Sequence, residues 1–99
     1  TPVEWKLVET FKGSSSMTTD YFYIEGADIR ITWTWTSEVP EFVLFSISLY
    51  REGTTLWAWY GMDLDSEGTT YVHDLKTDNY YLKIEEANVD EWIITIEVR

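Results

Sequence analysis

An acidic stretch near the middle of the chain has the spacing of a calcium-binding loop. Residues 63–68 read DLDSEG, and Asp74 occupies the twelfth place from Asp63. Calcium prefers about six to eight oxygen ligands, and alternate carboxylates with a glycine at the sharp bend supply several. The candidate metal ligands are therefore Asp63, Asp65, Glu67 and Asp74. Glutamate at the fifth place and flanks that predict strands depart from the usual pattern, so a merely solvated acidic hairpin loop is the alternative.

Aromatic side chains form the second candidate site, because many fall on the side of a predicted strand that faces away from the interior. The full set with this parity is Tyr21, Tyr23, Phe42, Leu44, Tyr50, Leu56, Tyr60, Tyr81 and Ile93. Exposed together, they would form a larger apolar patch than a monomer usually leaves bare. Flat aromatic rows stack on sugar rings or dock protein partners. Alternatively, loops cover these side chains, or the parity of one strand is reversed. The residues taken as partner-binding are Tyr21, Tyr23, Phe42, Leu44, Tyr50, Tyr60 and Tyr81.

Catalytic chemistry finds little support in the residue types. His73 is the single histidine, and the adjacent Asp74 carboxylate could hold it as a general base. Neighbouring residues of a strand point to opposite faces, so these two side chains would not meet easily. The carboxylate pairs Glu85-Glu86 and Asp65 with Glu67 would need a cleft between them for glycoside hydrolysis. A chain with 18 acidic residues brings carboxylates close together by chance. We therefore expect a protein that is not an enzyme.

The elements that position these residues are organised around residues 28–36, which read DIRITWTWT. Apolar and polar residues alternate there without a break, so one face carries isoleucine and tryptophan and the other threonine and arginine. The period of two predicts a central strand of an antiparallel sheet. We expect the interior to be filled by a set made of Ile31, Trp33, Trp35, Phe45, Ile47, Trp57, Trp92 and Ile94. For Trp57 and Trp59 two alternatives stay open: both belong to the core, or one is a ligand platform.

Strand patterns continue along the whole chain. We expect strands at residues 3–11, 21–25, 28–36, 42–51, 54–61, 69–73, 80–85 and 91–99. A polar break at 13–20, a turn at Gly26, a tight turn at Glu52-Gly53 and the acidic loop at 63–68 separate several of them. Many short strands with turns at regular spacing predict an all-β fold, an antiparallel β-sandwich of about eight strands with a Greek-key or jelly-roll-like arrangement. Residues 1–99 are expected to form a single domain.

Charge and composition narrow the function classes. The net charge is −11, which repels nucleic acid and anionic lipid. We expect no nucleic-acid partner and no membrane insertion, since no apolar run approaches the ~20 residues that span a bilayer. Cysteine is absent from the sequence, so disulfides and thiolate metal sites are excluded. The first residue is Thr1 rather than methionine, which indicates a processed product or an excised domain.

The last quarter of the chain resembles a known group of domains. Asn79-Tyr80-Tyr81-Leu82-Lys83-Ile84, then Ala87-Asn88-Val89, then residues 92–98 (WIITIEV) follow a YYLxI…AN…WxIxV pattern. This ending is similar to that of small, uncharacterised prokaryotic exported β-sandwich domains, and the layout is similar to sandwich domains appended to secreted peptidases. In that group a glycine usually precedes the tyrosines. Here Asp78-Asn79 stands instead, and is expected to adopt the left-handed conformation. The resemblance implies an exported accessory module without catalytic residues.

The function predicted from the sequence is that of a non-enzymatic interaction module of an exported or surface-displayed protein. Its partner would be a protein or a glycan held on the aromatic strand face. The alternative is a structural or assembly module that self-associates as a homo-oligomer or packs on a neighbouring domain. A calcium-stabilised module or a small hydrolase is less favoured. Calcium is the one candidate cofactor, and the expected location is extracellular or at the cell surface.

Overall fold

The computed structural model describes residues 4–25, 28–54, 56–62 and 64–99. Val3, Gly26 and Asp63, which carried predictions, lie outside the described residues. The elements are the strands β1 (Lys6–Gly13), β2 (Met17–Thr18), β3 (Phe22–Ile24), β4 (Ile29–Thr36), β5 (Leu44–Arg51), β6 (Trp57–Gly61), β7 (Glu67–Val72), β8 (Asp78–Ala87) and β9 (Glu91–Val98), with a short 3-10 helix η1 (Pro40–Phe42) before β5.

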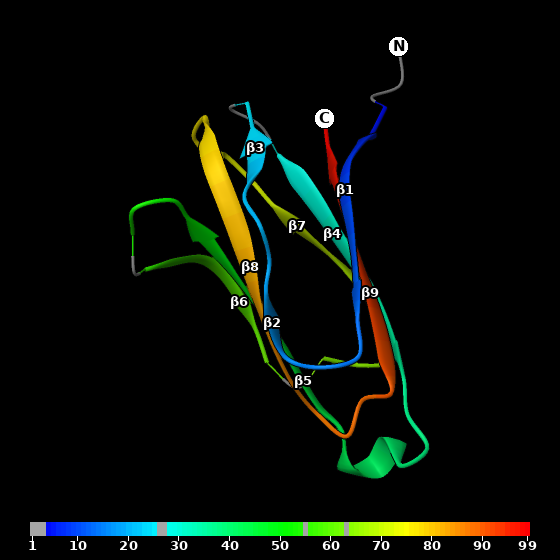
Figure 1. Cartoon of the computed structure of the whole chain (residues 1–99). Helices are drawn as coiled ribbons and strands as arrows, with labels where there is room; N and C mark the ends of the chain where they lie inside the picture. Colours follow the sequence, from blue (N-terminus) through cyan, green and yellow to red (C-terminus); the bar gives the residue numbers. More distant parts are fainter. Residues whose placement is uncertain (1–3, 26–27, 55, 63) are drawn as a thin grey trace.

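Two antiparallel sheets pack face to face, as Figure 1 shows. One has the strand order β1-β9-β4-β7, and we call it sheet A. The other has the order β2-β8-β5-β6, with β3 also pairing with β8, and we call it sheet B. When β2 and β3 are counted as one interrupted edge strand, the eight strands follow the order of a jelly roll. The predicted all-β sandwich is confirmed.

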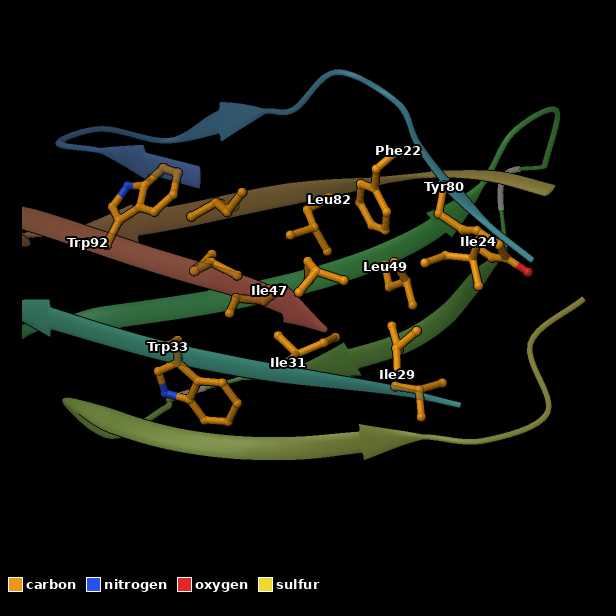
Figure 2. Packing of buried hydrophobic residues seen from close by; sticks show 14 of the residues in the cluster. Phe22, Ile24, Ile29, Ile31, Trp33, Ile47, Leu49, Tyr80, Leu82 and Trp92 are labelled. Atoms are coloured by element: carbon orange, nitrogen blue, oxygen red, sulfur yellow. The ribbon is translucent and has the colours of Figure 1, made fainter. Parts of the chain in front are cut away.

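The central strand β4 lies inside sheet A and turns its apolar side toward sheet B. Its residues pair with β9 on one side and β7 on the other, for example Ile31 with Ile96 and with Thr70. Ile29 and Ile31 are completely buried between the sheets, among residues from both layers (Figure 2). Burial of an aliphatic side chain of this size stabilises the fold by about 1.5–3 kcal/mol. The alternating pattern of residues 28–36 therefore predicted both the strand and its buried face.

Trp33 and Trp92 are buried in the sandwich, and each indole is held by a hydrogen bond and a closely packed glycine. The indole N–H of Trp33 donates to the Asp65 carbonyl at 3.0 Å, and that of Trp92 donates to the Ser15 carbonyl at 3.0 Å. A glycine lies against each ring: Gly68 against Trp33 and Gly13 against Trp92. A Cβ atom at either glycine would collide with the indole, so these glycines are required by close packing rather than by backbone conformation.

Sheet A turns a polar face to solvent. Thr10, Thr95, Thr32 and Thr69 pair in register across its four strands. Next to this row, Arg30 makes two hydrogen bonds to the Glu97 carboxylate, at 2.9 and 2.8 Å. This face is therefore largely polar, although the exposed Leu7 and Tyr71 also lie on it, paired with Glu97 and Arg30.

The N-terminal quarter contains two features that the sequence analysis did not predict, a bulge and a short extra strand. A bulge between Leu7 and Glu9 shifts the register of β1, so Leu7 is exposed while Val8 and Phe11 pack against the core. The predicted polar break at 13–20 contains the short strand β2, which pairs Met17 with Ile84. An inserted bulge residue reverses the parity of everything that follows it, and no residue type marks it in advance.

The C-terminal segment has clear structural roles. Leu82, Ile84, Trp92 and Ile94 are buried, and the buried Tyr80 donates its hydroxyl hydrogen to the Lys76 carbonyl at 2.7 Å. Burial also raises the pKa of that phenol. The left-handed conformation expected at Asp78-Asn79 is wrong, because both residues belong to β8. It occurs instead at Asn88, with φ of 65°, whose side-chain amide donates to the Phe42 carbonyl at 2.9 Å. Gly53, with φ of 81°, forms the turn predicted between β5 and β6.

Within the described residues, no helix has the length and apolar character needed to cross a bilayer.

Candidate functional site

A row of aromatic side chains crosses the outer face of sheet B. It consists of Tyr21, Tyr81, Tyr50, Trp57 and Tyr60, and we call it the aromatic row. Tyr21 packs edge-on against Tyr81 with ring centroids 5.6 Å apart, and Tyr81 stacks on Tyr50 at 5.2 Å with the planes at 15°. Tyr50 pairs with Trp57 in the ladder, and Trp57 lies 6.1 Å from Tyr60. The row thus extends from the β3 edge of the sheet to the β6 edge.

Tyr21 reaches the row because the edge strand is interrupted just before it. Between β2 and β3, the Thr19 N–H donates to the Leu82 carbonyl, and the Leu82 N–H donates to the Thr19 hydroxyl, both at 2.9 Å. The hydroxyl takes the place of a ladder carbonyl, so the buried N–H of Leu82 stays satisfied. The chain then resumes as β3 with Phe22 in the core and Tyr21 outside.

Trp57 was placed in the interior set, and this placement is wrong; of the two alternatives for Trp57 and Trp59, the structure has one core and one exposed tryptophan. The register of β6 shifts between the pairs Leu49–Trp59 and Tyr50–Trp57, which leaves Ala58 as an extra residue. This bulge places Trp57 on the outer face with 52% of its surface exposed, while Trp59 packs against the core near Trp33, at 6.3 Å. Strict alternation puts both tryptophans on the same side, and only the pairing partner reveals the shift.

The other predicted partner-binding residues lie apart from the aromatic row. Tyr23 is exposed on the same face but pairs with Asn79, beside the row. Phe42 lies in η1 and Leu44 begins β5, both exposed. Leu44 is six residues from Tyr50 on β5, roughly 20 Å along the strand.

Ile93 and Leu56, the two remaining residues of the predicted outward-facing set, lie in different parts of the sandwich. Ile93 belongs to β9, so it lies on the outer face of sheet A and not with the tyrosines. Leu56 immediately precedes β6 and is 76% exposed, next to the aromatic row.

The face that carries the aromatic row has few charged groups on its central strands. Its outward positions on β5 and β8 include Ser46, Ser48 and Asn79, while Lys83 and Glu85 form an ion pair at 3.5 Å. Carboxylates border this face, because the Asn79 side chain donates to Glu52 at 2.8 Å and Asp20 lines a hollow with Tyr21 and Tyr81. Ser48 is buried, so a ligand on the row meets mainly aromatic rings, with charged groups at the margin.

The residues proposed as calcium ligands are spread along β7. Asp65 and Glu67 lie at the start of this strand, whereas Asp74 follows its end and has φ of 59°. The six residues of β7 separate its two ends by roughly 16 Å. Gly68, expected at the bend of a loop, lies inside the strand and pairs with Trp33. Among the described residues no group of three or more His, Cys, Asp or Glu side chains could hold a metal ion.

Asp28 organises the charged groups at the far end of β7. Its carboxylate accepts the Asp74 N–H at 3.0 Å and the Arg99 guanidinium at 3.2 Å, and it lies 3.4 Å from His73 Nδ1. These contacts, the Asp74 hydrogen bond first, lower the pKa of Asp28. His73 is 58% exposed on its side chain, so the pair lies on an open surface. The arrangement anchors the C-terminal Arg99.

Comparison with known proteins supports the fold. No protein-family model matches this sequence, and no curated protein matches it. Among solved structures, the pre-peptidase C-terminal domain of collagenase from Bacillus anthracis superposes with a TM-score of 0.70. The alignment covers 92% of this chain and 90% of that one at 18% identity, a level at which the likeness extends to the fold alone.

A second neighbour is more distant. A protein of the disulfide-linked pili that form Bacillus endospore appendages covers 97% of this chain and 90% of its own, with 13% identity. Its TM-score of 0.38 is too low to support an argument.

Proposed function

We propose that this domain is a non-enzymatic interaction module, and that it holds a protein or glycan partner against the aromatic row. One observation carries the proposal. Five aromatic residues on neighbouring strands span sheet B from one edge to the other, and Tyr21, Trp57 and Tyr60 remain 57%, 52% and 41% exposed. Tryptophan and tyrosine are enriched among the residues that dominate binding energy at protein interfaces.

The fold is the second support. A jelly-roll sandwich presents its outer faces on a rigid scaffold, so the aromatic row is pre-organised for binding. The structural neighbour is named as a domain of a collagenase. That likeness favours an accessory role beside another protein part, and with it an extracellular or cell-surface location.

The test uses the double variant Trp57→Ala/Tyr60→Ala, which removes the two most accessible rings at one end of the row. Binders for the unmodified domain are selected from a peptide display library and a glycan array. An interface anchor of this kind contributes about 2 kcal/mol or more, so the double variant should bind at least roughly thirtyfold more weakly. Its melting temperature should change little, because both side chains are substantially exposed.

Phe42→Ala is the matched control, since Phe42 is an exposed aromatic residue away from the aromatic row. It should leave binding unchanged. Binders that the double variant retains in full, or that Phe42→Ala loses equally, would overturn the proposal. A concentration-dependent dimer that the double variant abolishes would replace it with the assembly role.

A further inference from the structure

The outer edge of β6 is unpaired and unusually free of charge. Among the described residues β6 is the last strand of sheet B and pairs with β5 alone, so half of its backbone N–H and C=O groups point away from the sheet (Figure 1). Residues 54–62 read TTLWAWYGM and contain neither a charged residue nor a proline. By contrast, the edge strand β1 carries Lys6, Glu9 and Lys12. Charged side chains and prolines are the usual means by which natural edge strands avoid pairing with other chains.

Apolar side chains surround this edge. Leu56, Trp57, Tyr60 and Met62 are 76%, 52%, 41% and 60% exposed. Trp57 and Tyr60 are in contact, with ring centroids 6.1 Å apart, and Leu56 and Met62 are exposed at the two ends of the same segment. The bulge at Ala58 adds twist, yet residues 59–61 keep regular pairing with β5. A strand added at this edge would therefore meet unpaired backbone N–H and C=O groups as well as exposed apolar side chains.

The chemistry of the occupant follows from charge. The chain has a net charge of −11, so two copies repel one another, whereas a basic segment is attracted. Exposed carboxylates of Asp65 and Glu67 follow the C-terminal end of β6, while the strand itself is neutral. A complementary ligand is neutral along the strand and basic beyond it.

We infer that the β6 edge binds an extended segment of a partner polypeptide whose strand-forming core is flanked by lysine or arginine. This inference rests on the proposed function, since it names the class of partner that would meet the aromatic row at its β6 end. A polypeptide, unlike a glycan, offers the alternating N–H and C=O groups that continue an antiparallel ladder. Tyr50 and Tyr81 stack on each other, so those two faces are closed to a sugar ring.

The probe is a short synthetic peptide of alternating threonine and valine with one lysine at each end, labelled for fluorescence anisotropy. Two further peptides have the same side chains but carry N-methyl groups on alternate residues, each on one of the two parities. In an added strand, successive residues point their N–H groups alternately toward the host and toward solvent. One methylated peptide should therefore bind at least about tenfold more weakly, because several backbone hydrogen bonds are lost, and the other should bind normally.

The Ala58→Lys variant tests the β6 edge by changing the protein instead of the peptide. Ala58 is exposed, so the substitution should leave folding intact while it places a cation beside the basic peptide. Binding of the peptide should fall by about three- to tenfold. Thr69→Lys is the matched control, because Thr69 is exposed on β7, the edge strand of sheet A, and it should leave binding unchanged.

Four outcomes overturn the inference. They are equal binding of both methylated peptides, equal loss in the Thr69→Lys variant, no binding of any peptide, and a β6-dependent homodimer in sedimentation. If binders selected on the aromatic row are lost in Trp57→Ala/Tyr60→Ala but kept in Ala58→Lys, the strand inference fails while the proposed function stands.

Discussion

The rings of Tyr50 and Tyr81 stack 5.2 Å apart on neighbouring strands, with their planes only 15° from parallel. The two residues pair directly in the β5–β8 ladder, on the face that points away from the core. Each ring shields one face of the other, which explains why both are half-buried although they face outward. This stack joins the two halves of the aromatic row.

The Tyr50–Tyr81 stack should be measurable as a coupling energy. In a double-mutant cycle with Tyr50→Ala and Tyr81→Ala, urea unfolding should give a coupling of about 0.5–1.5 kcal/mol, as aromatic pairs do beyond their buried area. A cycle between Tyr50→Ala and Phe42→Ala should be additive, because Phe42 lies away from the row. Additivity in both cycles would contradict the stack.

Replacement of Gly68 by alanine should destabilise the protein. The new Cβ would collide with the Trp33 indole, which is held by its hydrogen bond to Asp65. Overpacking of this kind costs about 1–3 kcal/mol. Urea unfolding of Gly68→Ala measures the loss, and Thr69→Ala, at the next and exposed position, should stay within about 0.5 kcal/mol of the original.

Acid should weaken the ion pair between Arg51 and Asp78. Their 2.6 Å contact lowers the pKa of Asp78 below its usual value, with the Asn79 N–H contributing as well. A carboxyl with a lowered folded-state pKa stabilises the fold above its unfolded pKa, and that contribution disappears as the pH falls through the folded pKa. The stability lost in Asp78→Asn should therefore be largest near neutral pH and should shrink in strong acid.

The pH effect is checked by urea unfolding of the original protein and Asp78→Asn across a pH series. Asp90→Asn removes an exposed carboxyl on the β8–β9 turn and controls for the general loss of negative charge. A penalty for Asp78→Asn that stays constant down to strong acid would show that the pair does not contribute through ionisation.

Calcium should leave the melting temperature unchanged. Asp65 and Glu67 lie at one end of β7 and Asp74 at the other, so these three carboxylates do not converge on one ion. Calorimetry with added calcium and with chelator measures the effect, and Asp65→Asn provides the comparison. A calcium-dependent rise in melting temperature that Asp65→Asn removes would restore the calcium loop.

The aromatic row could be predicted in part. Tyr21, Tyr50, Tyr60 and Tyr81 were assigned to the outer face from alternation alone, and the structure brings these four together. Alternation could not decide which of Trp57 and Trp59 is exposed, because the bulge at Ala58 has no signal in the residue types. Phe42 and Leu44 were included because alternation records the face of a strand but not the position along it.

The sequence by itself determined the fold class, the turn at Gly53 and the buried faces of β4, β8 and β9, since a period of two between polar and apolar residues has one physical solution in a half-buried sheet. Tertiary structure alone decided which strands are neighbours, where the bulges at Val8 and Ala58 reverse the parity, and that Asp65 and Asp74 are held apart by β7. Those features depend on which strands become neighbours. Strands that are far apart in the sequence are brought together by the packing of the two sheets, and no local residue pattern records that choice.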